Sequence, residues 1–295
     1  MKVLITGGTG YIGRHVAAQA CAQGWTCAVT TRGDPDRQMT RSGLAAFRYD
    51  GSLAQAREVV AAFLPDCVVH LAAAIVGEHV PEDAERILLG NVVFPCNLLE
   101  AMREHGCRLF VNTASFWQHY DGAAYRPTNF YAASKQAFED VLAHYVERGE
   151  VSAASLVLYD NYGANDERPK IVRLLVEAAL AGTPLEMTAG EQVIDLTHVD
   201  DIAQAYAAAI RALAAAPASA PAAHRWFVTG ERMRVADLVA LVERAACARA
   251  AWLGRRPYRP REIFNPVTPG APVPGWTPTR TLAEEVAAMI AEARQ

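Results

Sequence analysis

Long apolar runs are missing from this chain. The hydrophobic share of the 295 residues is 52%, yet no stretch reaches the roughly 18 to 20 unbroken apolar residues that a membrane span requires. Residues 1–5 lead directly into a strand and a glycine-rich turn, without the charged leader, apolar segment and cleavage site of a signal peptide. We therefore expect a cytoplasmic protein with no membrane partner.

Cysteine patterns, metal-ligand clusters and a basic excess are also lacking. The six cysteines are scattered without CxxC pairs or neighbouring histidines, so we predict neither a metal site nor a disulfide framework. A formal net charge of −4 lacks the basic excess that is typical of nucleic-acid binders. Only three lysines occur, Lys2, Lys135 and Lys170, so the positive charge is mainly arginine, which suits phosphate ligands.

Short apolar runs alternate with helical stretches along most of the chain. Strands are predicted at residues 3–6, 26–30, 67–71, 108–113, 155–158 and 226–229, and helices at residues 14–23, 54–63, 90–105 and 130–148. Such alternation indicates βαβ units and a parallel sheet. We predict an α/β fold in which helices flank a Rossmann-type parallel sheet of about seven strands.

A glycine-rich loop follows the first strand. Its sequence is Gly7-Gly8-Thr9-Gly10-Tyr11-Ile12-Gly13, and it lies between an apolar strand and a helix, the context in which this pattern binds a dinucleotide. Gly7 permits a tight turn, Gly10 lets backbone N–H groups approach a pyrophosphate, and Gly13 allows close packing of the helix on the strand. We predict that this loop holds a nicotinamide cofactor.

The end of the second strand distinguishes NAD from NADP(H). An acidic residue there hydrogen-bonds the ribose 2′-hydroxyl, whereas an arginine suits a 2′-phosphate. Thr31 stands at the acidic position and Arg32 follows it, which favours NADP(H). In the alternative interpretation Arg32 is an ordinary solvated residue, and Asp34 or Asp36 binds the ribose.

The two lobes are predicted from shifts in composition. Residues 1–163 form the dinucleotide-binding domain, to which residues 191–229 return, and residues 164–190 and 230–295 form a smaller substrate-binding lobe. Residues 257–278 are dense in proline, aromatics and arginine, as expected of a lid or substrate lobe. Residues 212–223 are almost entirely alanine, proline and serine, which predicts a helix end and a flexible connection without a function.

Tyr131 and Lys135 lie four residues apart in a predicted helix that Thr128 or Asn129 caps and Gly149 ends. Their side chains therefore share one face of the helix. A phenol is a poor acid or base at neutral pH unless a nearby cation favours the phenolate, and Lys135 supplies that cation. Alone this spacing is common on helix surfaces, but after a dinucleotide-binding loop it indicates a catalytic acid–base pair.

A third catalytic group is expected at the C-terminal end of the fifth strand, where parallel sheets bind their ligands. Ser115 lies there and would hydrogen-bond the substrate oxygen during hydride transfer. Thr113 is the alternative, and an ordinary hydroxyl at a strand end is the remaining interpretation.

These motifs, in this order, make the chain resemble the extended short-chain dehydrogenase/reductases, also called the NAD-dependent epimerase/dehydratase family. The resemblance implies that Asp50 and Gly51 face the adenine, that Ala72 and Ala73 line the cofactor channel, and that Lys135 bridges to the nicotinamide ribose. The resemblance further rests on His70-Leu71-Ala72-Ala73, Asn91 and His198-Val199-Asp200-Asp201. It implies that Leu71, Asn91, Tyr131 and Tyr159 also belong to the cofactor-binding residues.

Within that family, residues 116–120 and 129–140 are most similar to the CDP-abequose and CDP-paratose synthases, which reduce a CDP-linked 4-keto sugar with NADPH. Asp160 stands where the family usually has Asn, and Ile194 where many members carry Arg. The resemblance implies a nucleotide-diphosphate sugar as substrate. The candidate substrate contacts are Thr113, Trp117, His119, Asp160, Asn161 and Lys170. Arginines available for the diphosphate are Arg173, Arg234, Arg255, Arg259 and Arg261.

Dehydratases of the family carry an Asp-Glu pair after the catalytic hydroxyl, but Phe116 and Trp117 follow Ser115 here, which favours simple reduction. We predict NADPH-dependent reduction of a keto group, at C4, on a nucleotide-activated deoxysugar. The alternatives are an NAD-dependent nucleotide-sugar epimerase and a non-catalytic NADP(H)-binding sensor. The resemblance also implies a homodimer formed by residues 90–103 and 130–148.

Overall fold

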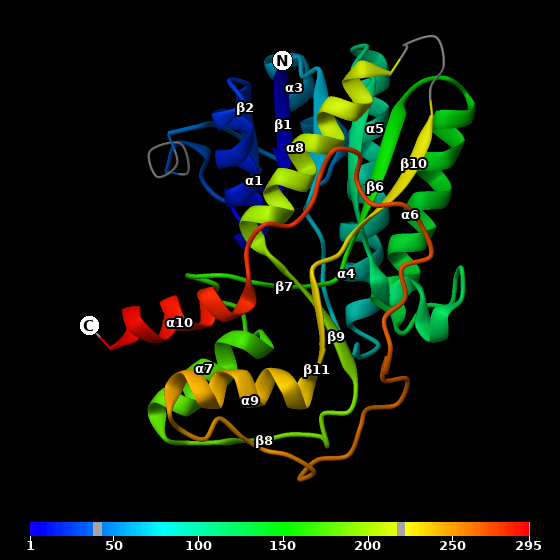
Figure 1. Cartoon of the computed structure of the whole chain (residues 1–295). Coiled ribbons are helices and arrows are strands. Elements are labelled where there is room, and N and C mark those ends of the chain that lie inside the picture. The colour runs from blue at the N-terminus through cyan, green and yellow to red at the C-terminus, as the bar shows by residue number, and fades with distance from the viewer. Residues whose placement is uncertain (38–42, 217–221, 295) are drawn as a thin grey trace.

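The computed structural model describes residues 1–37, 43–216 and 222–294. At its centre lies a parallel sheet in the order β10-β6-β5-β4-β1-β2-β3 (Figure 1). This seven-stranded sheet confirms the predicted Rossmann-type α/β fold. Its strands are β1 (Lys2–Thr6), β2 (Thr26–Thr31), β3 (Ala45–Arg48), β4 (Cys67–His70), β5 (Leu109–Ser115), β6 (Ser152–Leu158) and β10 (Ala223–Val228).

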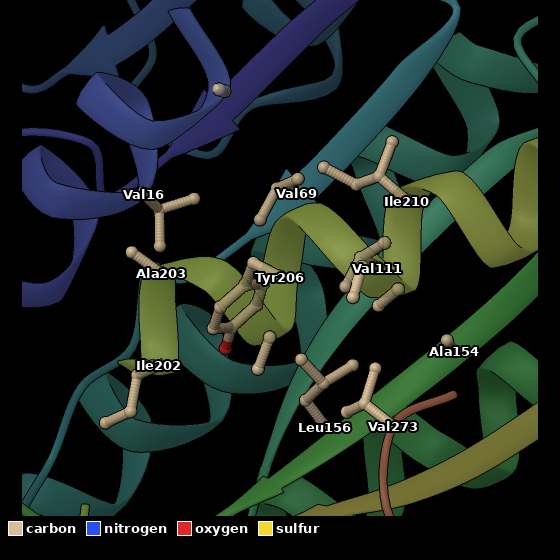
Figure 2. Close-up of a cluster of buried hydrophobic side chains, with 14 of the residues drawn as sticks. Val16, Val69, Val111, Ala154, Leu156, Ile202, Ala203, Tyr206, Ile210 and Val273 are labelled. Carbon is tan, nitrogen blue, oxygen red and sulfur yellow. The ribbon is translucent and has the colours of Figure 1, made fainter. Parts of the chain in front are cut away.

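Helices cover both faces of the sheet. The helices α1 (Tyr11–Ala22) and α8 (Val199–Ala215) pack on one face, and α3 (Leu53–Phe63), α5 (Phe94–Glu104) and α6 (Phe130–Glu147) pack on the other. Every residue of β4 and β6 is buried, as expected of strands covered on both sides. Figure 2 shows α8 lying across the first face, with Tyr206 pointing into the apolar cluster.

Local sequence signals explain where several helices begin and end. The Oδ1 atom of Asn129 accepts a hydrogen bond from the backbone N of Ala132 at 2.9 Å, which caps α6, and Gly149 follows the helix with φ +73°. The predicted helix over 90–105 is the end of a longer run that starts with α4 (Asp83–Leu88) and passes through a π-helical turn, η1 (Leu89–Val93). Pro95 has no N–H to donate to the turn before it, which accounts for the irregularity.

The second lobe is built from two small sheets and three helices. One sheet has the order β11-β9-β7 and the other pairs β12 with β8. Apolar side chains of all three helices and of the neighbouring strands form one separate core. The elements are β7 (Asp160–Tyr162), α7 (Ile171–Ala181), β8 (Leu185–Glu186), β9 (Val193–His198), β11 (Glu231–Arg234), α9 (Val235–Ala246), β12 (Ala251–Trp252) and α10 (Leu282–Ala293).

Parts of the chain lie on a different lobe from the one predicted. Residues 271–281 run back over the first domain (Figure 1), where Val273 and Trp276 share a core with Leu156. The side chains of Val273 and Trp276 complete that core. The prolines and polar residues around them in the sequence gave no indication that they would be buried there. Residues 191–229 were predicted to return to the dinucleotide-binding domain. Their first strand, β9, pairs with β7 and β11 outside the main sheet, so the part that packs on the first domain begins at α8. In the predicted connection 212–223, residues 217–221 lie outside the described residues.

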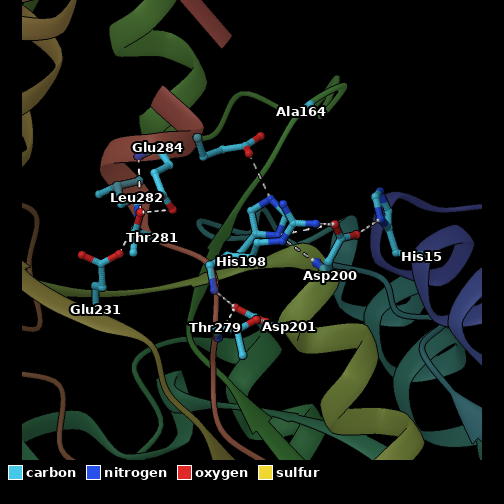
Figure 3. A network of polar contacts seen from close by, with 12 residues as sticks. His15, Ala164, His198, Asp200, Asp201, Glu231, Thr279, Thr281, Leu282 and Glu284 are labelled. Carbon is cyan, nitrogen blue, oxygen red and sulfur yellow. Dashed lines mark hydrogen bonds and ion pairs between the residues drawn. The ribbon is translucent and has the colours of Figure 1, made fainter. Parts of the chain in front are cut away.

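A polar network fastens the C-terminal helix to the first domain (Figure 3). The buried carboxylate of Asp201 accepts hydrogen bonds from the backbone N and the hydroxyl of Thr279 and from the backbone N of Arg280, at 3.0, 2.9 and 2.9 Å. The Nε2 atom of His198 lies 3.3 Å from a carboxylate oxygen of Glu285 on α10.

Among the described residues, no helix has the length and apolar character needed to cross a bilayer.

Candidate active site

The glycine loop joins β1 to α1 at the C-terminal edge of the sheet. Gly7 has φ +69°, and a Cβ placed on it would lie 2.7 Å from the backbone N of Ala72. A Cβ on Gly13 would lie only 2.1 Å from the carbonyl oxygen of Gly7, so neither position accepts a side chain without a backbone shift. Gly10 is the N-cap of α1, where no side chain caps the helix and no acid stands in the first turn. Backbone amides at this positive helix end therefore fit the pyrophosphate of a dinucleotide.

The outer residues of the loop lie between the two lobes. Thr9 is exposed, Ile12 is half-buried and Tyr11 is buried. The phenol of Tyr11 donates a hydrogen bond to the carbonyl oxygen of Ala164 at 3.2 Å. Tyr11 thus ties the start of α1 to the residues that follow β7.

The segment after β4, residues 71–73, lies against the glycine loop. The backbone N atoms of its first two residues donate to the backbone oxygen and hydroxyl of Thr6, at 3.1 and 3.4 Å. Asn91 is fully buried, accepts a hydrogen bond from the backbone N of Ala74 at 2.7 Å and donates to the hydroxyl of Ser134 at 2.9 Å. Its amide is engaged by protein groups, so Asn91 positions residues 71–74 and α6 relative to each other.

The predicted determinants of cofactor preference lie at the end of β2. The hydroxyl of Thr31 accepts a hydrogen bond from the backbone N of Gly33 at 3.1 Å. Arg32 is exposed and has no hydrogen-bonding or ionic partner among the described residues. The carboxylate of Asp34 accepts from the backbone N of Asp36 at 3.0 Å. A cation with a free guanidinium therefore lies beside the expected ribose position, and no carboxylate stands at residue 31.

Asp50 and Gly51 follow β3, which pairs with β2 and ends at the same edge of the sheet. The exposed carboxylate of Asp50 accepts a hydrogen bond from the backbone N of Ser52 at 2.8 Å. That bond lowers the pKa of Asp50. Gly51 has φ +101°, and a Cβ there would lie 3.0 Å from the ring of Phe94.

The predicted catalytic pair lies on the buried face of α6. Tyr131 and Lys135 are 7% and 1% exposed. Burial lowers the pKa of Lys135 from 10.5 to about 8, an effect that the charge of Glu139 partly opposes. Burial raises the pKa of Tyr131, and no hydrogen bond joins its phenol to Lys135. Tyr131 therefore keeps its proton at neutral pH before a cofactor binds, and stabilisation of its phenolate by Lys135 stays a prediction.

The two candidate hydroxyls at the end of β5 have different surroundings. Thr113 donates a hydrogen bond to the carbonyl oxygen of His70 at 2.7 Å, and its oxygen lies 2.7 Å from the phenol of Tyr206. Ser115 Oγ accepts a hydrogen bond from the backbone N of Trp117 at 3.3 Å, and among the described residues its own proton has no acceptor, so it is available to donate. The geometry favours Ser115 over Thr113 as the hydroxyl that meets a substrate.

Aromatic side chains surround this hydroxyl. The rings of Trp117 and Tyr131 meet edge to face with centroids 5.9 Å apart. Phe116 stacks on Tyr159 at 5.1 Å with 15° between the planes. The phenol of Tyr159 donates to the carbonyl oxygen of Val267, so its polar group faces the protein and it holds the 260s segment in place.

His119 also faces the interior of the protein. It is buried, its Nδ1 lies 3.2 Å from the carbonyl oxygen of Ala123, and its ring packs against Phe227. Burial lowers the pKa of His119, which keeps the ring neutral. These surroundings are those of a side chain that packs beneath the site.

The predicted substrate contacts of the second lobe gather around β7. Lys170 Nζ lies 3.7 Å from a carboxylate oxygen of Asp160, and burial raises the pKa of Asp160 while Lys170 opposes this effect. The Oδ1 atom of Asn161 accepts a hydrogen bond from Arg168 at 2.5 Å. Of the arginines proposed for a diphosphate, three are paired with acids: Arg173 with Glu177, Arg234 with Asp237 and Arg259 with Glu262, while Arg261 lies over the ring of Tyr120.

A polar cluster that the sequence did not predict lies behind Ser115. Gln118 is fully buried, accepts a hydrogen bond from the backbone N of Ser115 at 2.9 Å and donates to Glu139 at 2.6 Å. Glu139 in turn pairs with Arg225 of β10. The only sequence signal was the four-residue spacing between Lys135 and Glu139.

In the described part of the chain, no three His, Cys, Asp or Glu side chains gather into a metal site.

Comparisons with known proteins agree with this geometry. The chain is 27% identical over 209 residues to a CDP-abequose synthase of Yersinia pseudotuberculosis, covering 70% of this chain and 71% of that protein. It is 28% identical over 218 residues to a dTDP-glucose 4,6-dehydratase of Mycolicibacterium smegmatis, covering 68% and 66%. The solved structure of a UDP-glucose 4-epimerase of Thermus thermophilus in complex with NAD has a TM-score of 0.83 at 27% identity, covering 100% of this chain and 99% of that chain.

The family match begins in β1 and runs past the end of α8, so it covers most of the first domain and also β7, α7, β8 and β9 of the second lobe. Residues 3–221 match the NAD dependent epimerase/dehydratase family. This range includes the glycine loop, Ser115 and the pair Tyr131 and Lys135. The protein therefore belongs to the NAD dependent epimerase/dehydratase family.

Proposed function

We propose that the protein uses NADPH to reduce a keto group, at C4, on a nucleotide-activated deoxysugar. The observation that carries this proposal is the pair of aromatic residues directly after Ser115. Phe116 stacks on Tyr159 and Trp117 packs against Tyr131, so no carboxylate follows the hydroxyl to remove and deliver protons during water loss. The similarity to a CDP-abequose synthase supports a nucleotide sugar as the substrate.

The cofactor, when bound, supplies the hydride. The glycine loop would hold its pyrophosphate, Arg32 its 2′-phosphate, and Lys135 the hydroxyls of the nicotinamide ribose. These assignments fit the free helix end at Gly10, the guanidinium of Arg32, which has no partner within the described part of the chain, and the buried side chain of Lys135.

The chain's own residues handle the proton. Tyr131 is a neutral phenol in the folded protein, so it donates its proton to the ketone oxygen as negative charge develops there. Ser115 donates a hydrogen bond to the same oxygen and steadies it. The ammonium of Lys135, one helical turn away, stabilises the phenolate that remains after the transfer.

The reaction is tested by following NADPH oxidation with a CDP-linked 4-keto-3,6-dideoxyhexose, beside the dTDP- and UDP-linked 4-keto sugars. We expect turnover with at least one of them. Tyr131→Phe should abolish turnover while NADPH affinity stays within about twofold, because the phenol acts on the substrate and not on cofactor binding. Wild-type activity in that variant would contradict the role of Tyr131.

NADP(H) preference is tested separately at the end of β2. Thr31→Asp places a carboxylate where a ribose 2′-hydroxyl would be bound and a 2′-phosphate repelled. Affinity for NADPH should fall at least about tenfold relative to NADH, because like charges meet at a short distance. An unchanged preference would show that residue 31 does not face the ribose.

A second candidate is an NAD-dependent nucleotide-sugar epimerase. It is favoured by the match to the NAD complex of a UDP-glucose 4-epimerase over the whole of this chain. Such an enzyme would purify with bound NAD and would need no added reductant. Bound NAD, together with no NADPH oxidation on any of the three sugars, would favour this candidate.

We also propose a homodimer formed through the α5 and α6 helices. Next to α5, the side chains of Leu88, Leu89 and Val93 are 42%, 50% and 41% exposed, which is unusual for adjacent apolar residues on a helix surface. Leu89→Glu should shift the protein from dimer to monomer in sedimentation velocity. A monomeric wild-type protein would contradict the proposal.

A further inference from the structure

Three side chains from three elements form a polar cluster behind the catalytic residues. Arg225 lies on β10, Glu139 on α6, and Gln118 on the short helix η2 (Phe116–Gln118). The Arg225 guanidinium pairs with Glu139, whose side chain is 10% exposed, and Gln118 is fully buried. The cluster is closed off from solvent on the side of Gln118, where each hydrogen bond is difficult to replace with water.

One end of this cluster reaches Ser115. The side-chain oxygen of Gln118 accepts a hydrogen bond from the backbone N of Ser115 at 2.9 Å, and its NH₂ group donates to Glu139 at 2.6 Å. The NH₂ group also donates to Gln136 at 3.0 Å. Because Glu139 and Gln136 both accept, the amide of Gln118 has one orientation, and its oxygen must point at Ser115.

The other end of the cluster faces Lys135. Tyr131, Lys135 and Glu139 are spaced by four residues along α6, so they follow one another on the same face. Among the described residues, His70 at the end of β4 is a further titratable group that interacts with Lys135, and its Nδ1 lies 2.8 Å from the hydroxyl of Thr6. His70 stays neutral, because burial and the charge of Lys135 both lower its pKa. Glu139, one helical turn further along α6, is therefore the anion whose charge acts on Lys135, and Arg225 is the cation paired with it.

We propose that Glu139 is a positioning residue for both parts of the catalytic machinery: through Gln118 it fixes Ser115, and across one turn of α6 its negative charge holds Lys135 in the ammonium form. This inference rests on the proposed function for the role of Ser115 and Lys135 in ketone reduction. The charge effect on Lys135 is a property of the folded chain itself. The two can therefore be tested apart.

The charge effect is tested by titrating Lys135 directly. The chain has only three lysines, so ¹³Cε-lysine labelling gives three NMR signals, which Lys2→Arg and Lys170→Arg variants assign. In protein without added nucleotide, Glu139→Gln should lower the titration midpoint of Lys135 by about one pH unit, because the anion is lost and Arg225 is left unpaired. Glu147→Gln, the same substitution at an exposed position of α6, should leave the midpoint unchanged.

Arg225→Gln provides the opposite sign and a second route if Glu139→Gln does not fold. The side chain of Arg225 is 32% exposed, and its loss leaves Glu139 with an uncompensated charge that should raise the Lys135 midpoint. A midpoint that matches the wild type in each folded variant would overturn the charge role. A purely structural role for the cluster predicts no such paired shifts.

The positioning effect is tested by kinetics. Gln118→Leu should lower kcat at least about tenfold with the Lys135 midpoint unchanged, since it removes the bond to Ser115 but not the charge. Wild-type kcat in a folded Gln118→Leu protein would overturn the link to Ser115. If the wild type reduces no keto sugar but the Lys135 midpoints move as expected, the proposed function fails while the charge role of Glu139 stands.

Discussion

Lys135 is the residue for which the structure gives the most quantitative prediction. Its ammonium is 1% exposed, and burial lowers its pKa from 10.5 to about 8. One pKa unit corresponds to 1.36 kcal/mol, so the folded protein carries a penalty of about 3 kcal/mol for keeping this group charged. Lys135→Met keeps the length of the side chain and removes the charge. We expect the variant to lose activity and to gain up to about 3 kcal/mol of unfolding free energy at pH 7.

The gain should depend on pH with a defined sign. Below about pH 8, Lys135 is protonated in both the folded and unfolded states, and the penalty is constant. Between about pH 8 and 10.5 the unfolded state binds the proton while the folded state does not, so wild-type stability rises with pH relative to the variant. The difference between the two proteins should therefore shrink towards zero by about pH 10.5.

Urea unfolding of nucleotide-free protein at pH 7 and at pH 10 measures this difference, and groups common to both proteins cancel from it. Lys170→Met is the control, because Lys170 is half-exposed and close to Asp160. It should show no gain at pH 7. A Lys135→Met protein that is less stable than the wild type at pH 7, or a gain that is equal at both pH values, would refute the reasoning.

Other expected outcomes follow from single contacts. Gly13→Ala should abolish NADPH binding in isothermal titration, because the new Cβ would lie 2.1 Å from a backbone oxygen. Gly33→Ala is the control and should bind NADPH normally, because its new Cβ would lie no closer than 3.6 Å to a neighbouring atom. Asp201→Ala should lower the unfolding free energy by about 3 kcal/mol, because it removes three hydrogen bonds to a buried carboxylate. A loss below about 1 kcal/mol in urea unfolding would contradict this anchoring role. Ser115→Ala should lower kcat about a hundredfold and the unfolding free energy by only about 1 kcal/mol, the cost of its weak cap hydrogen bond to Trp117. Thr113→Val should instead lower the unfolding free energy with kcat near that of the wild type, since the Thr113 hydroxyl bonds His70 and Tyr206. Steady-state kinetics and urea unfolding of both variants distinguish these outcomes.

Parts of the site that depend on neighbours in the chain were predictable. The glycine loop requires its strand and helix within a dozen residues, and Tyr131 and Lys135 need only one turn of helix. Features that depend on pairing between distant segments were not. Gln118, Glu139 and Arg225 come from the short helix η2, the helix α6 and the edge strand β10, and no periodicity links them. For the same reason the sequence did not show that Thr113 is engaged by His70 and Tyr206, which left it as an alternative to Ser115.

The sequence by itself determined the fold class, the cofactor loop and the order of the motifs, because alternation of strands and helices and glycine conformation are local properties. Only the tertiary structure decided the protonation of the catalytic pair. Spacing alone predicts that a cation favours the phenolate of Tyr131, but both side chains are buried, and desolvation disfavours each charged form. Tertiary structure also decided that Val273 and Trp276 complete the core of the first domain, because apolar burial depends on which surfaces meet and not on their distance along the chain.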